Sequence, residues 1–326
     1  TIKLDGNYPT GTNNVALGDT ALDSVEAGGT DNVAIGDHAG TAITTGDKNI
    51  AIGSCALEKN TTAGENVAIG QQALQCNVTG IHNTGIGAGA LLKNTDCRNV
   101  AVGYHSLLCN TSGESNTAIG YNSLDANNTA DNNTAVGTCS LTCNTTGTPN
   151  IAIGSSALRD NTTGASNVAV GRSVLKVSTT ASNNTGIGSF SLNANTSGHS
   201  NVAVGCGALL TNTTGHSLVA VGKDSLKLNT EGLNNVAVGI GSLESNLTGS
   251  NNTAHGTYAL RCNTTAASNT ALGYGSLIAN TTGDNNTAVG ANALDANIGA
   301  DNNTAVGFNS LTLSTTGANN ASVGAF

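Results

Sequence analysis

The phrase Asn-(Thr/Val)-Ala-(Val/Ile)-Gly recurs along almost the whole chain, and this repeat constrains the fold more than any other feature of the sequence. With the Asn as position 1, units begin at Asn14 and continue to Asn320. Their spacing is 17 residues, apart from an 18-residue first unit and a 16-residue unit at Asn83. Position 5 is Gly in every unit, and position 9 is Leu in every complete unit except the one that has Gly40. Such regular self-similarity is typical of a solenoid, in which each unit stacks on the next.

Residue alternation predicts how each coil is built. Positions 2 to 4 place Ala between two β-branched or aliphatic residues, as in a strand with two different faces. We expect positions 2 and 4 to point into the coil and the Ala at position 3 to form a small, flat outer face. Gly at position 5 permits a turn, Leu at position 9 belongs to a second short strand, and Asn-Thr-Thr-Gly forms the second turn. Examples of the predicted Ala face are Ala34, Ala51, Ala68 and Ala101.

The predicted fold is therefore all-β, a parallel β-solenoid (β-roll) of about 18 coils with two short strands per coil. We expect one continuous solenoid over residues 14–326. Asn at positions 1 and 12 should stack from coil to coil into hydrogen-bonded ladders. Residues 1–13 depart from the consensus, with Ile2 and Leu4 alternating as in a strand. This segment is expected to cap the solenoid or to dock on the last coil of another copy.

The composition fits an elongated molecule with a thin core. There are 43 Gly among 326 residues, no Trp or Met, and only 2% aromatic residues, so few side chains are large enough to fill a compact globule. The net charge of −9 is spread thinly without a basic patch, which argues against nucleic acid as a partner. No apolar run of about 18 residues is present, so we expect no membrane span. No catalytic constellation or metal-ligand spacing stands out, and neither an enzyme nor a cofactor is predicted.

Three of the repeats, residues 32–36, 49–53 and 66–70, resemble the head repeats of YadA-like trimeric autotransporter adhesins. Similar repeats occur in phage tail fibres. The resemblance implies a left-handed parallel β-roll, three chains packed about a common axis, and binding to host surfaces or matrix. The unit here is longer than the one typical of that family, and the Asn-Thr-Thr turn is an addition.

The Asn-Thr-Thr turns contain Asn-x-Ser/Thr sequences, which accept N-linked glycans in secreted eukaryotic proteins. Glycans at position 12 would line one edge of the solenoid and coat a fibre. The alternative is that the motif serves only as turn chemistry, since Asn94, Asn229 and Asn297 keep the Asn without the acceptor motif. The candidate sites at position 12 are Asn60, Asn77, Asn110, Asn127, Asn144, Asn161, Asn195, Asn212, Asn246, Asn263 and Asn280. Others are Asn132, Asn183, Asn251, Asn285, Asn302 and Asn320.

Eight cysteines indicate an oxidising compartment. The expected coil geometry brings three pairs close together, two on adjacent coils and one within a coil. Cys206 and Cys262 lie three coils apart, beyond the reach of a disulfide, and are expected to be free or to link chains. The candidate disulfides are Cys55–Cys76, Cys97–Cys109 and Cys139–Cys143.

Histidine and aromatic residues recur at related positions. His199 and His216 share a position on consecutive coils and should stack, and we favour a solvated pair over a metal site. His255 lies at position 4 and is expected to be an irregularity of the core. Aromatic residues at positions 6 and 7 share one edge of the solenoid and are candidate subunit contacts. They are Tyr104, Tyr121, Tyr274, Phe308, Phe190 and Tyr258.

These features predict an extracellular structural protein, a fibre or filament subunit that self-assembles through the solenoid ends, the lateral Ala face or both. A first alternative is a trimeric surface adhesin head that binds host glycans or matrix. A second is an ice-binding solenoid, since Thr pairs recur in the second turn (Thr61-Thr62, Thr145-Thr146 and Thr162-Thr163). The inward direction expected for the Thr at position 2 argues against it. The predicted self-assembly residues at the two ends are Ile2, Leu4, Val323 and Phe326.

Overall fold

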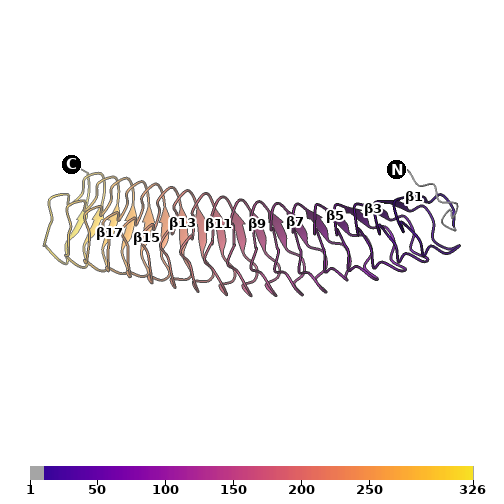
Figure 1. The fold of residues 1–326 in the computed structure, drawn as a ribbon. Helices are drawn as coiled ribbons and strands as arrows, with labels where there is room; N and C mark the ends of the chain where they lie inside the picture. The colour runs from indigo at the N-terminus through magenta and orange to yellow at the C-terminus, as the bar shows by residue number, and fades with distance from the viewer. Residues whose placement is uncertain (1–10, 326) are drawn as a thin grey trace. The chain divides into compact units, whose positions relative to one another are not determined.

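The computed structural model describes residues 11–325 and confirms the fold class. The chain is an all-β parallel β-solenoid of about 18 turns on the 17-residue repeat, and the described residues form no helix. Contacts divide the chain into two units, residues 1–163 and 164–326. The first unit carries β1–β9 and the second carries β10–β19, each as its own stack of strands (Figure 1).

Every strand is three residues long and covers positions 2 to 4 of one repeat. The strands of the first unit are β1 Val15–Leu17, β2 Val33–Ile35, β3 Ile50–Ile52, β4 Val67–Ile69, β5 Thr84–Ile86, β6 Val100–Val102, β7 Thr117–Ile119, β8 Thr134–Val136 and β9 Ile151–Ile153. Those of the second are β10 Val168–Val170, β11 Thr185–Ile187, β12 Val202–Val204, β13 Val219–Val221, β14 Val236–Val238, β15 Thr253–His255, β16 Thr270–Leu272, β17 Thr287–Val289, β18 Thr304–Val306 and β19 Ala321–Val323.

Successive strands within each unit pair in parallel and in register. Each residue at position 2, 3 or 4 lies beside the residue at the same position of the next coil, as between β2 and β3 and between β12 and β13. The backbone N–H at position 2 donates to the carbonyl at position 1 of the next coil, for example from Val33 to Asn49 at 2.8 Å. The fixed register makes each repeat position a continuous column along the unit.

The predicted alternation within the strand is confirmed, but its phase is the opposite of the one expected. Position 3 is buried in every strand from β2 to β18, whereas positions 2 and 4 are half-buried or exposed. In β6, Ala101 is 0% exposed while Val100 and Val102 are half-buried. The prediction of an outer Ala face is therefore wrong, because the methyl groups of Ala34, Ala51, Ala68 and Ala101 lie inside the coil.

The narrow interior explains this inversion. Gly85 replaces the Ala in β5, and a Cβ added there would lie 3.4 Å from Cγ of Leu74 and 3.2 Å from the carbonyl oxygen of Ala90. The Leu at position 9 of the preceding coil therefore occupies the space opposite the strand, where one carbon atom fits in van der Waals contact. The larger side chains at positions 2 and 4 point outward.

The second predicted strand is not formed, and each coil contains one strand instead of two. Positions 6 to 11 form a series of turns. The Leu at position 9 has a left-handed backbone, with φ of 54° at Leu124 and 49° at Leu141, which ends an extended segment. Both side chains are nevertheless 0% exposed, so the prediction that this Leu fills the interior is confirmed.

Enlarging a residue at position 3 tests the inverted phase. We expect Ala135→Val in β8 to lower the free energy of unfolding of the first unit by about 1–3 kcal/mol, because overpacking a tight core forces strained rotamers. Ala135 is 0% exposed. Thr134→Val, at the neighbouring outward position, is the control and should change it by less than about 0.5 kcal/mol. Thermal or denaturant unfolding measures both, and the reverse order of effects would contradict the inward direction of Ala135.

Candidate functional site: the outward strand faces

A continuous surface of each unit is the outer side of its strands, which we call the strand face and define as positions 2 and 4. Its side chains in the described strands are Val, Ile, Leu, Thr and Ala, with no Lys, Arg, Asp or Glu. The one exception is His255, at position 4 of its repeat. The strand face runs from Val15 and Leu17 to Ile151 and Ile153 in the first unit, and from Val168 and Val170 to Ala321 and Val323 in the second.

The strand face is both apolar and accessible. Ile119 and Ile187 at position 4 are each 40% exposed, and Ile151 at position 2 is 41% exposed. With strands about 4.8 Å apart and about 10 Å long, the strand face of the first unit covers about 430 Å². Contiguous apolar patches larger than a few hundred Å² mark interaction sites on soluble proteins. This surface was not predicted from the sequence, because positions 2 and 4 were expected to point inward.

Aromatic residues at position 6 extend the strand face on one side. Tyr104 and Tyr121 are 49% and 52% exposed, and their rings stack with centroids 5.6 Å apart. In the second unit, Tyr274 and Phe308 are 57% and 51% exposed. These residues share one repeat position, as predicted, and their role as subunit contacts stays a prediction. Position 7 differs, because the aromatic rings there each lie under an arginine. The guanidinium carbon of Arg172 is 4.4 Å from the ring centroid of Phe190, and that of Arg261 is 4.9 Å from the ring centroid of Tyr258.

The interior is held by two ladders of asparagine side chains, as predicted. At position 1, Asn99 and Asn116 are 0% exposed. The Oδ1 of Asn99 accepts the backbone N–H of Asn116 at 3.0 Å, and the Nδ2 of Asn116 donates to the carbonyl of Ala130 at 2.8 Å. This pattern satisfies backbone groups that water cannot reach. At Leu218 the ladder loses its side-chain acceptor, although the N–H of Leu218 still donates to Asn201 at 3.0 Å.

The second ladder, at position 12, links side chains directly. Nδ2 of Asn127 donates to Oδ1 of Asn110 at 2.8 Å and to the carbonyl of Ala130 at 3.0 Å. The same side-chain bond joins Asn144 to Asn127 at 3.1 Å. In the second unit the ladder runs from Asn195 to Asn297.

Burial of this ladder contradicts the prediction of glycans at position 12. An N-linked glycan is attached through Nδ2, and a side chain enclosed in the coil leaves it no room. The motif therefore serves as turn and ladder chemistry, the alternative considered from the sequence. The buried residues, all 0% exposed, are Asn60, Asn77, Asn110, Asn127, Asn144, Asn161, Asn195, Asn212, Asn246, Asn263 and Asn280. The exposed acceptor sequences are instead those at Asn132, Asn183, Asn251, Asn285 and Asn302.

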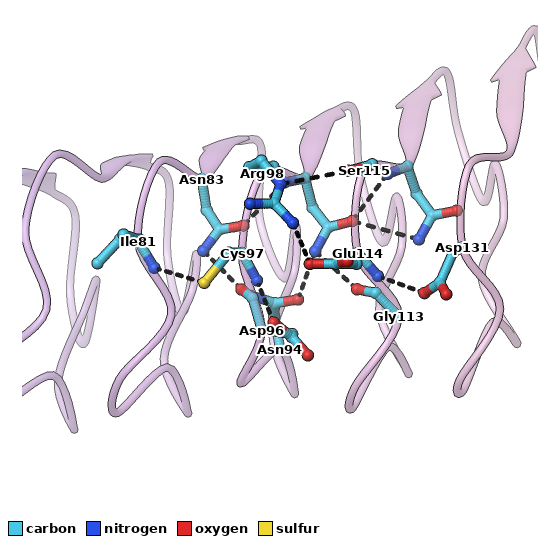
Figure 2. Close-up of polar contacts among 12 residues, drawn as sticks. Ile81, Asn83, Asn94, Asp96, Cys97, Arg98, Gly113, Glu114, Ser115 and Asp131 are labelled. Carbon is cyan, nitrogen blue, oxygen red and sulfur yellow. Dashed lines mark hydrogen bonds and ion pairs between the residues drawn. The ribbon is translucent and has the colours of Figure 1, made fainter.

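The unit at Asn83 has 16 residues, and its second turn is one residue shorter than usual (Figure 2). The carbonyl of Asp96 accepts from Nδ2 of Asn83 at 2.8 Å and from Nδ2 of Asn94 at 2.7 Å, so it replaces the carbonyl of the usual Gly. The Asp96 side chain accepts the N–H of Cys97 at 2.8 Å, and Arg98 pairs with Glu114 on the next coil. The position-1 ladder therefore continues through the shorter unit, where the N–H of Asn99 donates to Oδ1 of Asn83 at 2.9 Å. The position-12 ladder is interrupted before Asn94, since Oδ1 of Asn77 has no hydrogen-bond partner.

All eight cysteines are free thiols, so the structure contains none of the three predicted disulfides. Two of the sulfur atoms lie near polar hydrogens: the N–H of Ile81 lies 3.4 Å from Sγ of Cys97, and Nζ of Lys59 lies 3.9 Å from Sγ of Cys76. Burial, and then the negative charge of Asp160, raise the pKa of the Cys143 thiol, which lowers its reactivity. The unbonded pairs are Cys55–Cys76, Cys97–Cys109 and Cys139–Cys143.

Histidine positions confirm one prediction and correct another. The rings of His199 and His216 stack at 4.6 Å, as expected. His255 was expected in the core, but position 4 points outward and its side chain is exposed on the strand face. Within residues 11–325, no group of three or more His, Cys, Asp or Glu side chains is placed to hold a metal ion.

The first unit also carries a small polar hollow on its surface. A hollow of ≈ 260 Å³ in the first unit is lined by Asp47, Lys48, Glu65 and His82, among others. Glu65 pairs there with Lys48 at 3.6 Å and with His82 at 2.8 Å. Its volume is below that of typical ligand pockets.

Burial raises the pKa of Asp125, an effect that His105 and Lys93 oppose.

The predicted end-docking residues can be located only in part. Ile2, Leu4 and Phe326 lie outside the described residues, and Val323 is 83% exposed on β19. Asn13 donates through Nδ2 to Asp31 at 2.9 Å, which holds the end of the 1–13 segment against the first coil.

The part of the chain that the structure describes has no helix long and apolar enough to cross a bilayer.

Comparisons with known proteins add no family assignment. No family model matches the chain, and no curated protein sequence matches it.

Proposed function

We propose that this chain is a structural element of an extracellular fibre or adhesin, in which copies pack side by side through their strand faces. The observation that supports this is the strand face itself, two columns of aliphatic and Thr side chains without a Lys, Arg, Asp or Glu. The chain has a net charge of −9, and within residues 11–325 its charged side chains lie outside the strands. Such a surface gains free energy when another apolar surface covers it.

The area of the strand face favours a second copy of the chain as the partner that covers it. The strand face covers about 430 Å² in the first unit and about 480 Å² in the second, about 910 Å² in all, and a standard specific interface buries about 800 Å² on each partner. The regular spacing of the columns makes the strand face complementary to itself. Three copies about a common axis, the arrangement implied by the resemblance to YadA-like adhesin heads, would cover all three strand faces in a closed assembly. The adhesive ligand and the extracellular location are part of the same proposal.

Charged substitutions on the strand face test the proposal. We expect Ile119→Lys combined with Ile187→Lys to lower the association constant at least about 100-fold, because like charges brought together in an interface cost several kcal/mol. The matched control, Thr129→Lys with Thr214→Lys, places the same charges on exposed turns and should associate as the unmodified chain does. Sedimentation velocity measures all three proteins. Equal association of the two variants would contradict assembly through the strand face.

Ice binding is a second candidate, and one observation favours it. The Thr at position 2, expected to point inward, points outward. Thr253, Thr270, Thr287 and Thr304 follow one another on β15–β18 as a column of hydroxyl and methyl groups. The column beside it is aliphatic or His, so only one of the two columns carries hydroxyls. A thermal-hysteresis assay decides: activity that Thr270→Val with Thr304→Val abolishes would support ice binding, and no activity in the unmodified chain would contradict it.

A further inference from the structure

The only ionisable residue at positions 2 and 4 of the described strands is His255, on β15 of the second unit. Its strand neighbours are Val238 on β14 and Leu272 on β16, and Leu272 is 46% exposed. The imidazole makes no hydrogen bond or ion pair with any described residue. Four of the other histidines have a hydrogen-bond or ion-pair partner, such as Asp37 at 2.8 Å for His38 and Glu65 at 2.8 Å for His82, and the ring of His105 stacks on that of Tyr104. His255 therefore lies alone on an apolar surface.

From this position we infer that His255 makes the association of copies depend on pH, so that the assembly forms at neutral pH and dissociates in mild acid. The inference rests on the proposed function. Histidine is the side chain whose charge ordinarily changes between pH 5 and 8. Covering the strand face with a second copy places the imidazole in an apolar contact, which penalises its charged form.

A neutral imidazole can be accommodated in that contact. It carries one N–H donor and one acceptor nitrogen. The Thr column of β15–β18 supplies hydroxyl groups to the same interface, and each hydroxyl both donates and accepts. A protonated imidazole carries two donors and a positive charge, and no carboxylate lies on the strand face to balance it.

The surroundings of His255 supply no other titrating group on the strand face. The outward residues of β14 and β16 are Val236, Val238, Thr270 and Leu272. The turns that follow β14, β15 and β16 carry as titratable groups Glu244, Tyr258, Arg261, Cys262, Tyr274 and Asp284. Of these, Glu244 and Arg261 pair with each other at 2.8 Å. None of the six belongs to the columns that the proposed contact covers.

The direction of the effect follows from proton linkage. When the free chain binds a proton that the assembly excludes, acid favours the free chain. Association is then strongest at neutral pH and weakens as the pH falls into the mildly acidic range. The association constant should fall by up to about tenfold per pH unit for each copy that must release a proton.

The test compares the unmodified chain with His255→Val and with the control His216→Val by sedimentation velocity at pH 7.5 and 5.5. Asp and Glu ordinarily remain ionised at pH 5.5, with pKa values of about 4. We expect the unmodified chain and His216→Val to associate at pH 7.5 and dissociate at pH 5.5, and His255→Val to stay associated at both. Circular dichroism at each pH confirms that the coil remains folded.

Other outcomes separate the inference from the proposed function. Dissociation of His255→Val in acid to the same extent as the unmodified chain would assign the pH effect to other groups and overturn the inference alone. Association of the unmodified chain at both pH values would also overturn it while leaving the strand-face contact in place. An unmodified chain that is monomeric at both pH values would contradict the contact and, with it, the inference.

Discussion

Replacing the position-5 glycine of one coil with alanine, Gly273→Ala, should lower the free energy of unfolding of the second unit by about 3–5 kcal/mol. Two physical reasons combine. The backbone at Gly273 has φ of 137°, a conformation that side chains rarely adopt. An added Cβ would also lie 2.6 Å from both the carbonyl carbon and the carbonyl oxygen of Gly290 on the next coil. These are backbone atoms that cannot move away without distorting the stack.

Gly275→Ala, two residues further along the same coil, is the matched control. Gly275 has φ of 63°, and the nearest atom to an added Cβ is the movable Oδ1 of Asn292 at 2.9 Å. Other coils carry a side chain here, such as Ser156 with φ of 58°. The cost should be about 1 kcal/mol. Chemical denaturation monitored by circular dichroism measures both, and equal costs would show that close stacking at position 5 does not determine stability.

The second large effect is expected from breaking the inner ladder with Asn127→Ala. Asn127 is 0% exposed, donates to Asn110 and to the carbonyl of Ala130, and accepts from Asn144. Its loss removes the ladder partner on both sides, and each buried polar group left without a partner costs about 1–3 kcal/mol. We expect the first unit to lose about 3–5 kcal/mol, since these costs add.

The adjacent Asn128 provides the comparison for this prediction. It is the next residue in the chain but is exposed, and its Oδ1 only accepts a hydrogen bond from the Thr111 hydroxyl. Asn128→Ala should cost less than about 1 kcal/mol. Hydrogen exchange adds a second readout, because loss of the ladder should expose the amides of the adjacent coils. A small effect of Asn127→Ala would show that the ladder is not needed for stability.

The repeat period, the parallel solenoid and the asparagine ladders could all be predicted from the sequence, because they depend only on which residues recur and how far apart. The direction of the strand side chains could not. An alternation of Ala with Val or Ile fits either phase, and the larger apolar residues were assigned to the core by the usual rule. That rule fails here because Leu at position 9 already fills a narrow interior. A Cβ added at Gly85 would lie only 3.4 Å from Cγ of Leu74.

A signal for the correct phase was nevertheless present in the sequence. Position 3 accepts only Ala, Gly or Ser, as at Gly85, Gly186 and Ser322, which indicates a site without room. Position 4 accepts His255, which indicates a site open to solvent. The second strand was predicted wrongly for another reason. The left-handed backbone at residues such as Leu124 is rare for leucine, so residue type gave no indication of it.

The mass of the chain in solution tests the central claim most directly. Sedimentation equilibrium of the full chain at pH 7.5 and micromolar concentration should give a multiple of the 32.0 kDa chain mass, and the three-copy arrangement predicts three times that value. The strand faces would then be covered in the assembled state. A single species of 32.0 kDa across the concentration range would contradict the account, because the strand faces would remain exposed to water.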